Sequence, residues 1–80
     1  MGVGEAVKLR ILELCKEQGI TVNKLATICG LTQSTLSNIT GGRNNSATIS
    51  TIKKICDGLG ITIIDFFASH LFENLEQEIK

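Results

Sequence analysis

Glycine interrupts this 80-residue chain at short intervals, and that spacing limits it to a fold built from short elements. Glycine follows each of several segments in which apolar residues recur at spacings of three and four. These glycines are Gly19, Gly30, the pair Gly41-Gly42 and Gly60. Such a period predicts amphipathic helices, and glycine is the residue that most often ends a helix. Because helices this short are stable only when they pack on one another, the sequence predicts a compact all-α bundle of about five helices.

The apolar period also predicts where the helices lie. The expected ranges are 4–18, 22–29, 33–40 and about 48–58, a fifth helix anchored by Phe66 and Phe67, and a further helical stripe over 71–79. A side chain that can cap the first turn precedes most of these segments. These residues are, in chain order, Thr21, Thr32, Thr48 (or Ser46) and Thr62.

The composition disfavours several other classes of protein. With no Pro and three Phe residues, the chain does not look like a β-sandwich or a β-barrel. Apolar runs fall short of the roughly 20 residues that span a bilayer, and residues 1–6 lack the pattern of a signal peptide. We therefore expect a cytoplasmic protein with no membrane segment.

Residues that could carry catalysis or bind a metal are few and scattered. Cys15, Cys29 and Cys56 are an odd number of cysteines at wide spacings, so we expect reduced, buried thiols rather than a zinc site or disulfides. His70 has no neighbour that would complete a metal site or a nucleophile. With no Gly-rich phosphate loop either, the sequence predicts no enzymatic activity, no metal, no cofactor and no small-molecule ligand.

The formal net charge of +0 hides an uneven distribution of charge along the chain. Between Gln18 and Cys56 there is no Asp or Glu, whereas residues 61–80 carry half of the acidic side chains and a single cation, Lys80. The acid-free stretch is rich in Ser, Thr, Asn and Gln, and its cations are Lys24, Arg43, Lys53 and Lys54. A surface made from it would suit a polyanion, although charge alone does not separate this from a merely polar face.

The second and third expected helices meet at a very short glycine turn, which is the helix-turn-helix layout. Such a turn needs a small residue where the helices cross, supplied by Ala26, and a positive φ four residues later, supplied by Gly30. Leu31, Leu36 and Ile39 would hold the third helix in the core. The polar residues that this arrangement directs outward are Gln33, Ser34, Ser37 and Asn38.

Residues 21–42, TVNKLATICGLTQSTLSNITGG, resemble the helix-turn-helix of the phage repressor and Cro family, also called the XRE family. Residues 52–62, IKKICDGLGIT, resemble the fourth helix of that family and its approach to the fifth. The resemblance implies a five-helix DNA-binding domain over 1–68 that works as a dimer on a palindromic operator. Residues 69–80 would form a C-terminal helical extension, and the apolar series from Phe66 to Ile79 offers a dimer contact.

The resemblance also implies the roles of individual residues. The third helix would enter the major groove, with Gln33 at its start as the base-reading glutamine, since an amide can pair with N6 and N7 of adenine. The expected base-reading residues are Gln33, Ser34, Ser37 and Asn38. The expected phosphate contacts are Thr21, Lys24, Thr32, Thr35, Arg43, Asn44 and Thr48, of which Thr35 could also reach a base.

The sequence departs from the family pattern in two places. Val22 stands where many relatives carry a polar residue that braces the recognition glutamine or a phosphate. Cys15 and Thr40 stand where many relatives pair an Arg in the first helix with a Glu at the end of the third. We hypothesise that neutral packing replaces that ion pair, which avoids desolvating two charges.

The function implied is that of a transcriptional regulator whose partners are a double-stranded DNA operator and a second copy of the chain. A repressor is favoured over an activator because blocking a promoter needs only operator binding. The open alternative is a protein-interaction module on the same fold, such as an antitoxin-like or phage accessory factor. Retention on duplex DNA at low salt, lost as salt rises, would separate the two.

Overall fold

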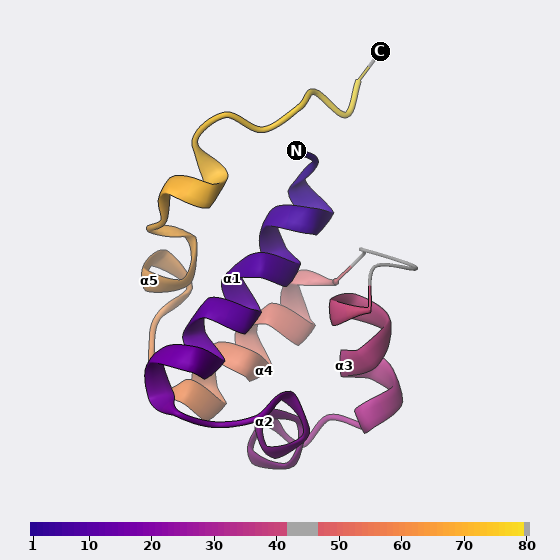
Figure 1. Cartoon of the computed structure of the whole chain (residues 1–80), viewed down its shortest axis with the longest axis vertical. Helices are drawn as coiled ribbons and strands as arrows, with labels where there is room; N and C mark the ends of the chain where they lie inside the picture. The colour runs from indigo at the N-terminus through magenta and orange to yellow at the C-terminus, as the bar shows by residue number, and fades with distance from the viewer. Residues whose placement is uncertain (42–46, 80) are drawn as a thin grey trace.

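The computed structural model describes residues 1–41 and 47–79, and every regular element in these ranges is helical, which confirms the all-α fold. Five α-helices are followed by one turn of 3₁₀ helix (Figure 1). The elements are α1 (Val3–Gln18), α2 (Val22–Cys29), α3 (Gln33–Thr40), α4 (Ile49–Leu59), α5 (Ile63–Phe67) and η1 (His70–Phe72). Their bounds lie close to the ranges expected from the apolar period.

The helices pack around α1 and α4. In Figure 1, α1 runs along the molecule with α4 behind it, α2 crosses one end, and α3 and α5 lie on opposite sides. α2 packs on α3 and α4, and α1 contacts α2, α3 and η1. This arrangement leaves the outer side of the α2–α3 pair uncovered by other described elements.

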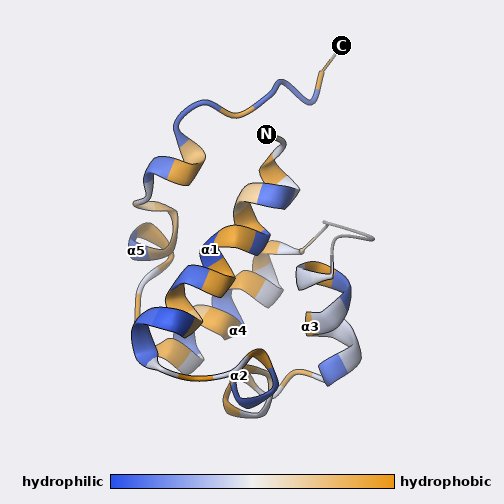
Figure 2. Ribbon diagram, in the orientation of Figure 1, coloured by the Kyte–Doolittle hydropathy of each residue, from blue (hydrophilic) through white to orange (hydrophobic). Residues whose placement is uncertain are grey.

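The core is built from one apolar stripe of each helix. Ile11, Leu25, Leu36, Ile55 and Phe66 are completely buried, one from each of the five helices. Burial of each such side chain contributes about 1.5–3 kcal/mol, so helices this short depend on the shared core for their stability. Figure 2 shows apolar and polar residues interspersed along α1 and α4, whereas α3 is drawn largely in white and blue.

Threonine starts most of the helices, as the sequence predicts. A threonine is the N-cap of each of the helices from α2 to α5, and its side-chain oxygen accepts a backbone N–H of the first turn. In chain order these residues are Thr21, Thr32, Thr48 and Thr62. Thr62 and Asp65 complete a capping box. Thr48, rather than Ser46, therefore begins α4; Ser46 lies outside the described residues.

The helix expected over residues 71–79 is wrong beyond Phe72. α5 ends at Phe67, its C-cap Ala68 has left the helical conformation (φ −80°, ψ 70°), and Ser69 is extended. Residues 73–79 follow η1 without helical structure. Phe72 instead turns back onto Phe66 and Phe67, with ring centroids 6.2 and 4.8 Å away. The apolar spacing of this segment thus reflects packing of a folded-back turn, and not a continuous helical stripe.

Residues 73–79 run along the N-terminal end of α1. The backbone N–H of Glu76 donates to the carbonyl of Met1 at 3.0 Å, and both chain ends lie at the same end of the molecule (Figure 1). No helix within 1–41 or 47–79 combines the length and the apolarity needed to cross a membrane. Those same ranges contain no cluster of His, Cys, Asp and Glu arranged to hold a metal ion.

Candidate nucleic-acid interface

The turn between α2 and α3 has the geometry that the sequence predicts. Gly30 adopts φ 69°, a left-handed conformation that favours glycine, and the N–H of Leu31 donates to the carbonyl of Ala26 at 3.0 Å. Ala26 is only 1% exposed, so a larger side chain would have no room there. These contacts hold α3 at a defined angle to α2.

α3 divides into a buried and an exposed face. Leu36 and Ile39 lie in the core, whereas Gln33, Ser34, Ser37 and Asn38 are all exposed. At about 100° per residue, these four side chains occupy an arc of about 140° on the side opposite the two buried residues. We call the exposed set Gln33, Ser34, Ser37 and Asn38 the recognition face.

Two threonines at the start of α3 are bonded to each other. The N–H of Thr35 donates to Thr32 Oγ1 at 3.1 Å, and the two hydroxyl oxygens are 2.8 Å apart and share a hydrogen bond. Because only one of the two O–H groups is used between them, the pair keeps one donor for an outside acceptor. On the helix circumference, Thr35 lies between the recognition face and the buried face, where a phosphate is easier to reach than a base.

The starts of α2 and α4 carry the other expected phosphate contacts. Thr21 Oγ1 accepts the N–H of Lys24 at 3.1 Å, and both side chains are exposed. At α4, Thr48 Oγ1 accepts the N–H of Thr51 at 3.1 Å and donates to Thr51 Oγ1 at 3.0 Å. Each helix start thus presents hydroxyl groups and first-turn N–H groups to solvent, which is a suitable environment for an anion.

Two expected phosphate-binding residues, Arg43 and Asn44, lie outside the described residues. The other nine expected site residues are all described and all exposed. Gln33, Ser34, Ser37 and Asn38 share one face of one helix. Thr21, Lys24, Thr32, Thr35 and Thr48 lie in the first turns, or at the N-caps, of three different helices.

Comparison with known proteins agrees with this geometry. Residues 10–68 match the family model described as the Cro/C1-type HTH DNA-binding domain, which covers most of the chain. The chain belongs to the Cro/C1-type helix-turn-helix family. It is therefore a DNA-binding protein of the transcription-regulator type that the sequence predicts.

A solved relative supports the same assignment for this Cro/C1-type protein. This chain is similar to the protein in the crystal structure of the prophage Lp1 protein 11, with 39% sequence identity and a TM-score of 0.82. The match covers 94% of this chain and 100% of the relative. No curated protein matches the chain.

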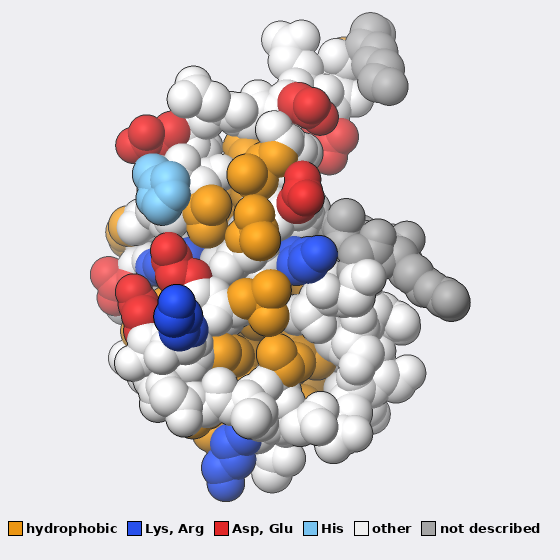
Figure 3. Space-filling view, in the orientation of Figure 1, with side chains coloured by type: hydrophobic (Ala, Val, Ile, Leu, Met, Phe, Trp, Pro, Cys, Tyr) orange, Lys and Arg blue, Asp and Glu red, His pale blue; other side chains and the backbone are white. Residues whose placement is uncertain are grey.

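The surface of this Cro/C1-type domain is uneven in charge. On the face shown in Figure 3, acidic side chains gather over the α5 side and along the C-terminal segment, whereas the surface over α3 is uncharged. Lys24 is the one cation within α2 and α3. Lys53 is engaged by Asp57, whose hydrogen bond and negative charge raise the pKa of that ammonium.

Sequence reasoning missed one residue at this surface, Thr51. Its hydroxyl takes part in the Thr48–Thr51 hydrogen bond at the start of α4. The arrangement repeats that of Thr32 and Thr35, a threonine followed three residues later by another. That spacing is visible in the sequence and would have identified Thr51.

The two departures from the family pattern involve uncharged residues, of which Cys15 is buried and Val22 and Thr40 are half-buried. Val22 packs against the core and Cys15 is 4% exposed, so neither offers a polar group to the surface. The hydroxyl of Thr40 donates to the carbonyl of Leu36 at 3.0 Å, within its own helix. α1 packs on α3, yet direct neutral packing of Cys15 against Thr40 stays a prediction.

Proposed function

We propose that this protein is a sequence-specific repressor that binds an operator as a homodimer and places α3 in the major groove. The observation that carries the proposal is the recognition face, four exposed polar side chains directly opposite the buried Leu36 and Ile39. The helix-turn-helix fold presents such a face to base edges. The family match favours this reading over the protein-interaction module, which would not need a polar, acid-free face.

The contacts divide into base-reading and positioning groups. Gln33, Ser34, Ser37 and Asn38 would contact base edges. The phosphate contacts would come from the helix starts and the following loop, namely Thr21, Lys24, Thr32, Thr35, Arg43, Asn44 and Thr48. Because few of these residues are charged, register on the DNA would depend mainly on hydroxyl and backbone N–H donors.

Repression is the mode of action that needs the fewest additional surfaces. A helix-turn-helix domain bound across a promoter excludes polymerase by occupying the site, with no contact to polymerase required. The relative of known structure is a prophage protein, which supports a phage-type regulator. Repression is tested by transcription in vitro from a promoter that overlaps the selected site.

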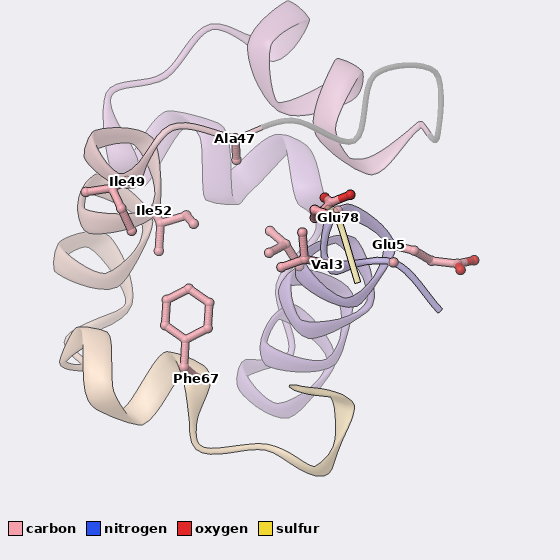
Figure 4. A pocket seen from close by; sticks show the side chains of 10 residues that line it. Val3, Glu5, Ala47, Ile49, Ile52, Phe67 and Glu78 are labelled. Carbon is pink, nitrogen blue, oxygen red and sulfur yellow. The ribbon is translucent and has the colours of Figure 1, made fainter. Parts of the chain in front are cut away.

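The dimer contact that we favour lies around an open cavity of about 650 Å³ at the N-terminal end of α1. Figure 4 shows Val3, Ile52 and Phe67 directed into it from α1, α4 and α5. Ile49, which also lines the cavity, is 64% exposed, and Ile64, three residues before Phe67 in α5, is 81% exposed. An apolar surface that is contiguous and open to solvent commonly marks a protein contact, and we propose that these side chains form one.

A pair of matched variants tests this dimer contact against the C-terminal segment. Ile64→Asp should shift the protein from dimer to monomer in sedimentation equilibrium. Ile79→Asp, at a position 88% exposed in the segment after η1, should leave the dimer intact. Dissociation by Ile79→Asp with no effect of Ile64→Asp would move the contact to residues 69–80.

The DNA-reading role is tested with a duplex selected from random sequences. Gln33→Ala should weaken binding to the selected duplex by about 1–3 kcal/mol and leave binding to unrelated duplexes almost unchanged. Gln77→Ala, an exposed glutamine in the C-terminal segment, is the matched control and should bind as the wild type does. Lys24→Ala should weaken all duplexes alike and lower the salt slope by about 1 per protomer. Equal weakening on every duplex by Gln33→Ala would contradict base reading.

A further inference from the structure

The outer side of α1 carries a line of four side chains that the core does not use. They follow one another at spacings of four, three and four residues, which at about 100° per residue places them within an arc of about 60°. In chain order they are Glu5, Leu9, Leu12 and Lys16. We call this set the α1 stripe. Its two leucines are not among the apolar side chains that pack on the core.

The α1 stripe is open to solvent. Glu5 and Lys16 are exposed, Leu12 is 37% exposed and Leu9 is half-buried. Figure 3 shows apolar side chains in the middle of the face over α1, and Figure 4 shows Glu5 directed away from the cavity. The ion pairs among residues 1–41 and 47–79 involve neither Glu5 nor Lys16. Two leucines between opposite charges that lack an ion-pair partner form a surface that a second molecule can cover.

The order of residues in the α1 stripe makes it complementary to itself when reversed. Its middle lies between residues 10 and 11. At about 1.5 Å per residue, Leu9 and Leu12 stand about 2 Å, and Glu5 and Lys16 about 8 Å, on either side of that middle. We propose that the α1 stripe binds the α1 stripe of a second copy of this chain in an antiparallel, two-fold pair. Glu5 of one copy then faces Lys16 of the other at both ends, and four leucines form the centre.

Charge selects both the direction and the partner. A parallel pair would place Glu5 against Glu5 and Lys16 against Lys16, and like charges that face each other oppose association. A partner helix with charges of one sign would match one end of the stripe and repel the other. Lys8 and Glu13 lie about 70° to either side of the stripe's middle, so they remain in water at the rim.

The pair of α1 stripes differs from the dimer contact proposed above. It uses neither Ile64 nor any residue of the recognition face, so it joins two dimers and leaves the residues that read DNA unused. One stripe from each helix is a small contact, below the roughly 1,200 Å² that stable interfaces bury. The association is therefore weak and forms at high protein concentration.

Carbodiimide cross-linking of the wild-type protein tests the pair directly, because this reagent joins a carboxylate to an amine only where the two touch. Within one α1 helix, Glu5 and Lys16 stand about 16.5 Å apart along the axis, too far for such a bond. In a mixture of unlabelled and isotope-labelled protein, mass spectrometry should find peptides that join Glu5 of one copy to Lys16 of the other. Absence of this cross-link at millimolar protein would overturn the proposal.

Charge reversal supplies the second test. It is made in the Ile64→Asp protein, which lacks the other contact, so that sedimentation equilibrium reports the α1 pair. Glu5→Lys or Lys16→Glu alone should weaken association by about tenfold or more, because like charges then face each other at both ends. An equal mixture of the two variants should associate as the parent does. Glu17→Lys, the same change at an exposed position of α1 outside the stripe, is the control and should have no effect.

The outcomes separate this pair from the proposed function. Association that is unaffected by either reversal, or that is not restored on mixing, would overturn the α1 pair. Glu5→Lys should still prefer the selected duplex, because the stripe makes no DNA contact. Enrichment of no duplex sequence at all would instead overturn the proposed function and leave the α1 pair in place.

Discussion

Arg10 in α1 binds the carbonyl oxygen of Phe66 at the end of α5, with Nε donating at 2.7 Å. Its Nη2 donates to the carbonyl of Asp65 at 2.8 Å, and Nη1 pairs with Glu13 on its own helix. The Arg10 side chain is 11% exposed, so a guanidinium largely shielded from solvent receives its partners from the last turn of α5. Carbonyls at the C-terminal end of a helix attract a cation. This contact therefore joins α1, the first helix of the chain, to α5, the last α-helix.

Arg10→Ala should lower the free energy of unfolding by about 2 kcal/mol, because hydrogen bonds to a charged group are lost from a mostly buried site. Urea unfolding followed by circular dichroism measures the change. Lys53→Ala is the control, since it removes an ion pair whose side chains are 56% and 58% exposed. That variant should unfold as the wild type does. An Arg10→Ala protein as stable as the control would mean that the tie between α1 and α5 contributes little.

Gly58→Ala should destabilise the fold although alanine is the better helix former. A Cβ atom at Gly58 would lie 2.5 Å from Cys29 Sγ and 3.1 Å from Ile28 Cγ2, where α4 packs on α2. Such overpacking typically costs about 1–3 kcal/mol, which outweighs a propensity gain of about 1 kcal/mol. Thermal unfolding measures the loss.

Cys29→Ala provides the test of that contact. It removes the nearest atom, so the Gly58→Ala/Cys29→Ala double variant should lose less stability than the two single changes added together. A single Gly58→Ala variant more stable than the wild type would show that α2 and α4 do not approach this closely.

The three thiols should make stability fall at alkaline pH. Burial raises the pKa of Cys15, Cys29 and Cys56 above the ordinary 9.0, and for Cys29 the neighbouring thiolates add to the effect. Well below pH 9 the thiols are protonated in both states. As pH rises further, they ionise first in the unfolded chain, so the free energy of unfolding falls until the folded thiols ionise too.

Urea unfolding at pH 8, 9 and 10 under reducing conditions measures this slope. Replacing all three cysteines by alanine should flatten it. Alkylation by iodoacetamide gives an independent readout, since the folded protein should react far more slowly at pH 8.5 than the chain in urea. Cys15 and Cys56 are buried and Cys29 is half-buried, and equal alkylation rates in the two states would contradict this shielding of the thiols.

The elements that local chemistry defines could be predicted from the sequence. Thr21 and Thr32 cap helices, and Gly30 turns the chain, through groups only a few residues away. The exposure of the recognition face could also be predicted from local spacing, because a helix that buries Leu36 and Ile39 directs Gln33, Ser34, Ser37 and Asn38 to solvent.

Contacts between distant segments could not be predicted in this way. Arg10 binds backbone carbonyls 55 and 56 residues away, and a carbonyl has no residue type that a sequence pattern can reveal. The close approach at Gly58 is likewise visible only once α2 lies against α4. The helix predicted over residues 71–79 is wrong because the spacing of Leu71, Leu75 and Ile79 fits a helix, although these residues do not form one. The extended backbone at Ser69, which begins the turn of η1, is not visible in that spacing.

The central claim is that the exposed face of α3 reads the DNA sequence, and one variant tests it most directly. Gln33→Ala/Ser34→Ala/Ser37→Ala/Asn38→Ala removes the recognition face and keeps every buried residue, and alanine favours the helix. We expect an unchanged circular dichroism spectrum, unchanged affinity for unrelated duplexes, and equal affinity for the selected and unrelated duplexes. A quadruple variant that still prefers the selected duplex as strongly as the wild type would contradict the account.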